Sequence, residues 1–535
     1  MTRLSIFDIP HLKDEVTQYL SCKDLAQCAL VSRAWFGWFS QVLWSDLNFD
    51  YELLSFPSLQ GLIRHADHVR SISGFHQYMK LIPAASSPKF PNLQSLDHWP
   101  DWNSNYGENR LLQFISATPS LQKIVLIVTL RPQVYKLLLE TLESHPGLKS
   151  LELNCYEVVD PIMTQNIVMA CGRLESLESL IITFGQDPPP EGRGSDEVQN
   201  AIAMESMSQM SDTRIQHLKI VPSHRLQELA ILVPLVQRCP LLESLNLTVL
   251  FHEETLGQLT RLFQEGRCPH LNKLVIGYIE TYENVENDLK ELLRHVGSDV
   301  DTQGIRNGLD SMTAMFGDPL VAPYLLSLTQ YHAATLRSLN LAQQLLKVGM
   351  FFQFVCGLPK LQVLKAVIEM DDRVEEQLDM DTVVKTPWAC LDLKSLELNL
   401  DSACCKDQID RPDWKDSLPD RVLIYLFSQI GRLHSLQEWN LQTGDVNLLT
   451  LDLSYLSNLT GLKQLRWITI GQLFTTHVQL KEADAEWMML HWSKLVHVTT
   501  RSGNAPSAMP LQASDTGLEQ FNEKLVALRP WIMVD

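Results

Sequence analysis

A short apolar pattern, Leu-x-x-Leu-x-Leu with occasional Ile, recurs along most of the chain. Its clearest copies begin at Leu148, Leu177, Ile215, Leu242, Leu271, Leu336 and Leu393, and weaker copies begin at Leu93, Leu121, Leu361, Leu436, Leu462 and Leu495. Many successive copies start 27 to 29 residues apart. Because alternate residues of a strand point to opposite sides, the inner leucines of each copy share one face, and the residue between them lies on the other.

Helical patterns separate these strands. Residues 133–146, 161–174 and 225–240 carry apolar positions three and four residues apart, and each stretch ends near Gly or Pro. One strand and one helix cannot cover their own apolar side, so the repeats must stack into a curved parallel sheet with outer helices. The period is that of a leucine-rich repeat. The interval from 271 to 336 predicts one degenerate repeat or a long helix, and that from 177 to 215 predicts an insertion.

The residues between the inner leucines predict a binding surface on the concave face of this solenoid. They are mixed in charge, so each alone is more simply a solvated strand residue, but together they are the candidate substrate-binding set. The set is Glu152, Lys219, Asn246, Asn340, Lys365, Glu397, Asn440 and Arg466, with Ile181 and Val275 at the same position of their repeats. Loops 185–197, 369–381 and 401–414 each follow a repeat strand and form a second candidate at one rim.

The first fifty residues have a different pattern, that of three short helices. We expect helices over 11–20, over 22–31 with Ser21 and Asp24 at its start, and from Ser32 onward. Trp35, Trp38 and Trp44 fall in the last of these segments. A unit of this size cannot bury so much aromatic surface internally, so some of it must pack on a partner or on the next domain.

Composition narrows the class of partner. The chain of 535 residues has a formal net charge of −19, which argues against nucleic acid or an anionic membrane as the main partner. No apolar run is long enough to span a membrane, and no secretory signal pattern opens the chain. The ten cysteines lack a framework spacing, which indicates reduced thiols and a cytoplasmic or nuclear protein.

The sequence offers no motif for covalent chemistry. Gly-rich phosphate loops, a Gly-x-Ser-x-Gly elbow and paired zinc-ligand spacings are all missing, and Cys404-Cys405 has no second ligand pair. Cys155, at a strand end, is expected to be structural. We therefore predict a non-enzyme with no catalytic residue, no metal and no cofactor.

The N-terminal segment resembles the F-box motif over roughly residues 5–49. The resemblance rests on Ile9-Pro10, on the stretch from Tyr19 through Lys23-Asp24-Leu25 and Leu30-Val31-Ser32 to Trp35, and on Leu43-Trp44. It implies a surface for the Skp adaptor and, through it, a cullin. The residues implied to form this interface or its supporting core are Pro10, Leu12, Val16, Leu20, Leu25, Val31, Trp35 and Trp44. Ile9 replaces the usual Leu, and Pro10 lies one residue closer to Leu20 than is common.

The chain as a whole resembles F-box proteins with leucine-rich repeats, the substrate receptors of SCF-type ubiquitin ligases. The expected fold is α/β, with an F-box over 1–50, a linker over 51–90, a single-core solenoid over 91–500 and a tail with a short helix over 501–535. The solenoid would hold an unknown protein substrate. One alternative is a repeat scaffold outside the ligase, whose N-terminal helices cap the solenoid. A weaker alternative is a repeat protein that regulates a small GTPase.

Overall fold

A computed structural model gives the fold in two compact units, residues 1–242 and 243–535. The single core that the sequence predicts over 91–500 stays a prediction. The structure describes residues 10–49, 58–74, 89–98, 108–156, 161–185, 211–221, 232–248, 253–277, 284–297, 308–315, 324–369, 386–401, 418–443, 457–470, 482–499 and 516–534.

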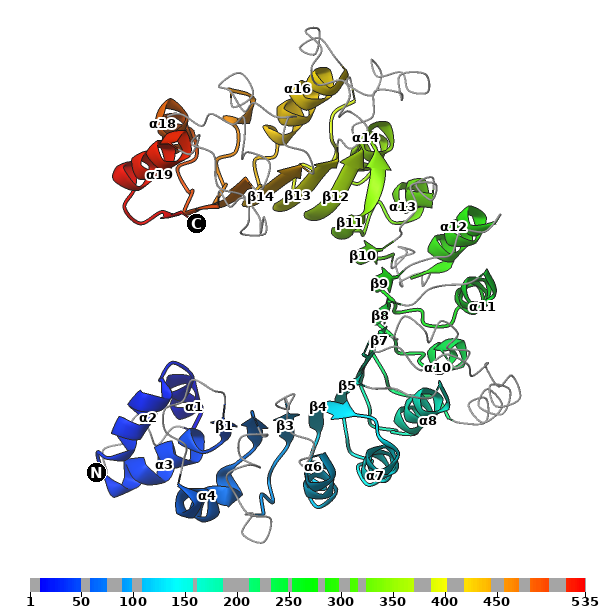
Figure 1. The fold of residues 1–535 in the computed structure, drawn as a ribbon, viewed down its shortest axis with the longest axis vertical. Helices are drawn as coiled ribbons and strands as arrows, with labels where there is room; N and C mark the ends of the chain where they lie inside the picture. Colours follow the sequence, from blue (N-terminus) through cyan, green and yellow to red (C-terminus); the bar gives the residue numbers. More distant parts are fainter. Residues whose placement is uncertain are drawn as a thin grey trace. The chain divides into compact units, whose positions relative to one another are not determined.

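The first unit is a group of short helices followed by a parallel sheet. Strands β1 to β7 pair in chain order, each parallel to the next. Helices α6, α7 and α8 lie along one side of the strands (Figure 1). The elements are α1 (Pro10–Gln18), α2 (Cys22–Ala29), α3 (Arg33–Leu43), β1 (Asp46–Asn48), α4 (Leu59–His65), η2 (Ala66–His68), β2 (Ser71–Ser73), β3 (Ser95–His98), α6 (Glu108–Ser116), β4 (Lys123–Thr129), α7 (Pro132–Glu143), β5 (Ser150–Tyr156), α8 (Pro161–Gly172), β6 (Ser179–Phe184), β7 (His217–Val221) and α10 (Leu232–Gln237).

The repeat at β5 shows why this sequence folds as predicted. Its pattern leucines Leu148, Leu151 and Leu153 are fully buried, and alternate residues of β5 are partly exposed. Leu138 and Leu142 fill the buried side of α7. Before each of β2 to β7, two successive backbone N–H groups donate to one carbonyl of the preceding repeat, as Lys149 and Ser150 do to Gln122. The main chain therefore ties each repeat to its neighbour at the point where the strand begins.

The N-terminal helices begin at well-formed caps. Ser21 accepts the Asp24 N–H, while the Asp24 carboxylate accepts the Ser21 N–H, a reciprocal pair that fixes the start of α2. Ser32 accepts the Trp35 N–H at the start of α3. All three helices match the ranges expected from the sequence to within a few residues.

The second unit continues the same plan through ten paired parallel strands, β8 to β17. Helices α11, α12 and α16 lie on one side of their strands (Figure 1). The elements are β8 (Ser244–Leu247), α11 (Glu253–Gln264), β9 (Lys273–Ile276), α12 (Val285–His295), β10 (Ser311–Ala314), α13 (Leu325–Tyr331), β11 (Ser338–Lys347), α14 (Val348–Cys356), β12 (Val363–Glu369), β13 (Ser395–Asp401), α16 (Leu418–Ile430), β14 (Glu438–Thr443), η8 (Ser457–Leu459), β15 (Trp467–Ile470), α18 (Glu482–His491), β16 (His497–Thr499), α19 (Thr516–Leu528) and β17 (Met533–Val534).

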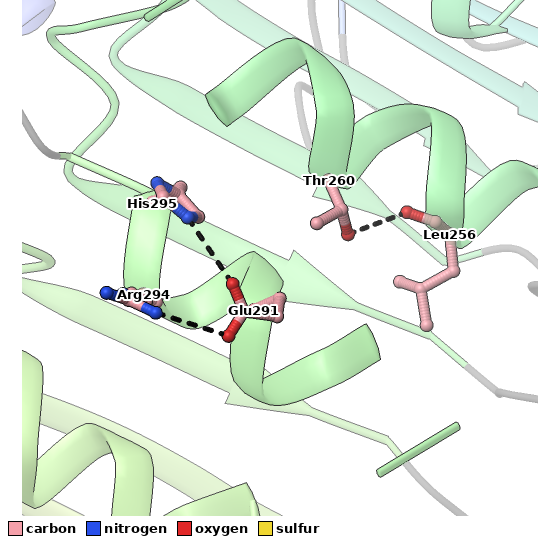
Figure 2. Close-up of polar contacts among 5 residues, drawn as sticks. All are labelled: Leu256, Thr260, Glu291, Arg294 and His295. Atoms are coloured by element: carbon pink, nitrogen blue, oxygen red, sulfur yellow. Dashed lines mark hydrogen bonds and ion pairs between the residues drawn. The ribbon is translucent and has the colours of Figure 1, made fainter. Parts of the chain in front are cut away.

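Two outer helices of this unit, α11 and α12, hold polar side chains by contacts within the helix. Figure 2 shows the buried Thr260 hydroxyl donating to the Leu256 carbonyl one turn earlier in α11. On neighbouring α12, the Glu291 carboxylate pairs with Arg294 and His295, each at 3.5 Å (Figure 2). Apart from Thr260, the buried residues of both helices are apolar, and most of them are leucines.

Strand pairing extends beyond the solenoid range predicted from the sequence. β1 and β2 lie before residue 91, and β17 lies after residue 500. Between 271 and 336 the sheet contains β10, which is the degenerate repeat, with Leu309, Met312 and Ala314 buried at the pattern positions. Except for Gly185, Glu369 and Asp401, the three candidate loops lie outside the described residues.

Candidate functional site

The N-terminal helices have a small core of their own. Leu25, Ala29 and Phe39 are buried together. Leu20, Cys28, Trp35, Val42 and Leu43 pack against them while staying partly exposed. The Trp35 and Phe39 rings lie 5.4 Å apart. Three of the expected adaptor residues, Leu20, Leu25 and Trp35, therefore support the helices from within.

Trp44 connects this core to the next helix. Its ring stacks on that of His65 in α4, with centroids 4.7 Å apart, and a Cβ at Gly61 would lie only 2.9 Å from the indole. Phe36 meets His65 edge-on at 6.3 Å. Desolvation by these neighbours, with smaller contributions from His68 and Arg64, lowers the pKa of His65. Trp44, one of the expected adaptor residues, thus packs against its own chain.

The same helices leave large apolar side chains in solvent. Tyr19 is 83% exposed, Leu30 79% and Val31 63%, and Val16 and Phe36 are also exposed. Leu12 is half-buried, and nothing of the Pro10 side chain is described. Val16 and Val31 were expected in this surface, whereas Tyr19, Leu30 and Phe36 were not singled out as contacts. We call Val16, Tyr19, Leu30, Val31 and Phe36 the N-terminal apolar patch.

The sheet of each unit has a second candidate surface, which we call its open face: the partly exposed, alternate strand positions opposite the buried leucines. In the first unit Glu152 pairs in register with Ile181, and Ile181 with Lys219. Asn154 lies two residues beyond Glu152, with its amide 3.4 Å from the carboxylate. β4 departs from the alternation because Val125 and Ile127 are buried as well.

In the second unit most predicted open-face residues are held by local contacts. Lys365 and Glu397 lie opposite each other and form an ion pair at 2.7 Å. The Asn246, Asn340 and Asn440 side chains each accept a hydrogen bond from a residue two positions further along, namely Thr248, Ala342 and Gln442. Asn340, Lys365, Glu397 and Asn440 follow one another in register across β11 to β14.

The placement of Arg466 is a correction. Arg466 precedes β15, and Thr469 is the residue that pairs in register with Asn440. The sequence pattern was assigned three residues too early here, because Leu462 and Leu465 resemble the first two leucines of a copy. The strand instead uses Leu465 and Ile468 as its buried positions.

Buried thiols line the interior rather than a reactive surface. Burial raises the pKa of Cys155, and it raises the pKa of Cys171 to about 12. Within the described residues no group of three or more His, Cys, Asp or Glu side chains is placed to hold a metal ion. In the same part of the chain, no helix has both the length and the apolar character needed to cross a membrane.

The comparisons with known proteins give likenesses in structure and none in sequence. No protein-family model matches the chain, and no curated protein matches it. A solved crystal structure of the Rad7 and Elc1 complex in yeast is similar over 100% of this chain and 98% of that one, at 14% sequence identity and a TM-score of 0.36. A likeness of this size carries no argument about function, so the proposals below rest on the residues themselves.

Proposed function

We propose that the chain is the substrate-recognition subunit of an SCF-type ubiquitin ligase. In this role α1 to α3 act as an F-box that binds the Skp adaptor, and the adaptor binds a cullin. The observation that carries the proposal is the N-terminal apolar patch. Large apolar side chains exposed together are typical of surfaces that another protein covers.

The division between supporting core and exposed patch favours a docking platform. Leu25 and Phe39 are buried in the core of the helices, whereas Leu30 and Val31 are exposed and available to contact a partner. The capping box at Ser21 fixes the start of α2, the helix whose last turn leads into Leu30 and Val31. A preformed platform loses little conformational entropy on binding.

The repeats would hold the target protein on their open faces. The chain then contributes no covalent chemistry of its own. It raises the effective concentration of the target's lysines beside the ubiquitin-loaded enzyme. The mixed polar character of the open faces suits a protein partner more than a polyanion, in keeping with the net charge of −19.

The alternative is a repeat scaffold whose N-terminal helices only seal the end of the sheet. A seal would bury Leu12, Val16, Leu20 and Trp35 against the following residues. Here Val16 is exposed and Leu12, Leu20 and Trp35 are only partly buried. This pattern favours the adaptor surface, although β1 also joins these helices to the sheet through β2.

The test is capture of purified Skp adaptor by the full chain and by a Leu30→Glu/Val31→Glu variant. Leu490→Glu is the matched control, because Leu490 is 76% exposed on α18, far along the chain. We expect the wild type and the control to capture the adaptor and the double variant to lose it, with unchanged circular dichroism. If the intact chain captures no adaptor, the ligase proposal is contradicted and the scaffold alternative is supported.

A further inference from the structure

The open face of the second unit changes character at its last strands. The first residues of the strands pair with one another and form a row across the sheet. This row has small or aliphatic residues in β11 to β13 and larger side chains in β14 to β17. The paired row reads Ser338, Val363, Ser395, Glu438, Trp467, His497 and Met533, from β11 to β17. None of the last four residues was singled out from the sequence.

Trp467 presents an aromatic surface to solvent. Its side chain is 52% exposed, and its ring stacks on that of His497 with centroids 5.7 Å apart and an interplanar angle of 26°. The His497 Nε2 lies 2.8 Å from the Thr499 hydroxyl, and this hydrogen bond fixes the imidazole. Thr469 and Thr499 follow two residues later on the same face and pair with each other in register.

Packing alone does not require a tryptophan at this position. The buried positions of the repeat are already filled by Leu465 and Ile468. The counterparts of Trp467 in β11 and β13 are serines. An indole held in solvent by a stacked histidine is therefore better explained by a ligand than by the core.

An acidic residue occupies the matching position on the strand at the other side of β15. Glu438 pairs in register with Trp467 from β14 and is exposed. Neighbouring strands lie about 4.8 Å apart, so a group resting on the indole is within reach of this carboxylate. Glu397, on the adjacent strand, is already paired with Lys365 at 2.7 Å, whereas no described residue forms an ion pair with Glu438.

We propose that Glu438, Trp467 and His497 hold an arginine side chain of the target protein. A guanidinium is planar and stacks on an indole, and its fork of N–H donors matches a carboxylate. The net charge of −19 favours approach of a basic segment. The inference rests on the proposed function in one respect, that the open face is where the target binds.

The test uses the full chain labelled with 5-fluorotryptophan and followed by fluorine NMR, with the Trp467 resonance assigned from Trp467→Phe. The probe is the capped peptide Gly-Ser-Arg-Ser-Gly, and its matched control carries citrulline, the uncharged analogue, in place of arginine. We expect a saturable shift of the Trp467 resonance with the arginine peptide. The citrulline peptide should bind the wild-type chain at least about fivefold more weakly than the arginine peptide does. The Glu438→Gln variant should bind the arginine peptide more weakly by a similar factor.

Glu265→Gln is the control variant, because Glu265 is exposed in the same unit outside this row. It should bind the arginine peptide like the wild type. An absent or non-saturable shift, equal shifts with both peptides, or wild-type affinity in Glu438→Gln would overturn the arginine site. Adaptor capture is measured on the same samples. Arginine binding without adaptor capture would contradict the ligase role and would still support the arginine site.

Discussion

At the scale of the residue, single buried polar side chains form hydrogen bonds to the main chain of neighbouring repeats. In the second unit, buried His332 accepts the Leu309 N–H at Nδ1, at 3.1 Å, so its Nε2 carries the proton and donates to the Leu293 carbonyl at 2.7 Å. Buried His145 reaches the Thr118 carbonyl in the same way in the first unit. One histidine thus satisfies main-chain groups from successive repeats.

Replacing His332 should therefore be costly. His332→Ala leaves a buried N–H and a buried carbonyl without their hydrogen bonds to the imidazole. We expect a loss of about 2–4 kcal/mol in the free energy of unfolding, measured with urea. His295→Ala removes only the partly exposed pair with Glu291 and should cost less than about 0.5 kcal/mol. Equal losses in the two variants would show that the His332 bridge is not structural.

The residue scale is also where sequence reasoning was least complete. Alternation alone correctly put Asn340, Lys365, Glu397 and Asn440 in one row. It could not show that Lys365 and Glu397 neutralise each other, because that depends on which strands are neighbours. Trp467 was missed for a related reason: the leucine pattern was placed three residues too early in that repeat.

At the scale of elements, caps and turns determine where helices begin and how closely repeats pack. The three N-terminal helices were predictable because Ser21, Asp24 and Ser32 are local signals. β1, β2 and β17 were not predictable, since strands of two or three residues contain too few positions to show an alternation.

The capping box at α2 gives a pH-dependent prediction. Hydrogen bonds from Ser21 lower the pKa of Asp24 in the folded chain, so its contribution is present above the unfolded pKa, about 4, and is lost as the pH falls through the folded value. At pH 7, Ser21→Ala should destabilise α2 by about 1 kcal/mol, measured by amide hydrogen exchange. This loss should shrink in acid. Lys23→Gln should show a much smaller effect, because the Lys23 charge lowers the pKa of Asp24 less than the Ser21 hydrogen bonds do.

Close contact between repeats gives a second prediction at this scale. Gly431 follows α16, and a Cβ there would clash with the backbone carbonyl of Asn458 in η8. Gly431→Ala should lower the free energy of unfolding by more than about 2 kcal/mol. Gly257, inside α11, has open space around it, so Gly257→Ala should raise stability by about 0.5–1 kcal/mol. Thermal melts of both variants should move in opposite directions, and a common direction would refute the clash.

At the scale of the whole molecule, the chain combines a group of N-terminal helices with two stretches of stacked repeats. The parallel sheet was predictable because the leucine pattern recurs often enough to show its period. The interval from 271 to 336 holds a degenerate repeat at β10, which is one of the two outcomes expected for it. The division near residue 242 was not predictable, since the same local pattern continues on both sides of it.

The most direct test of the central claim is a calorimetric titration of purified Skp adaptor into the full chain. We predict one adaptor per chain. Leu30→Glu/Val31→Glu should weaken the affinity at least about tenfold, because it places two charges in the N-terminal apolar patch. Leu490→Glu should bind like the wild type. No binding by the intact chain, or equal binding by the double variant, would contradict an adaptor surface on these helices.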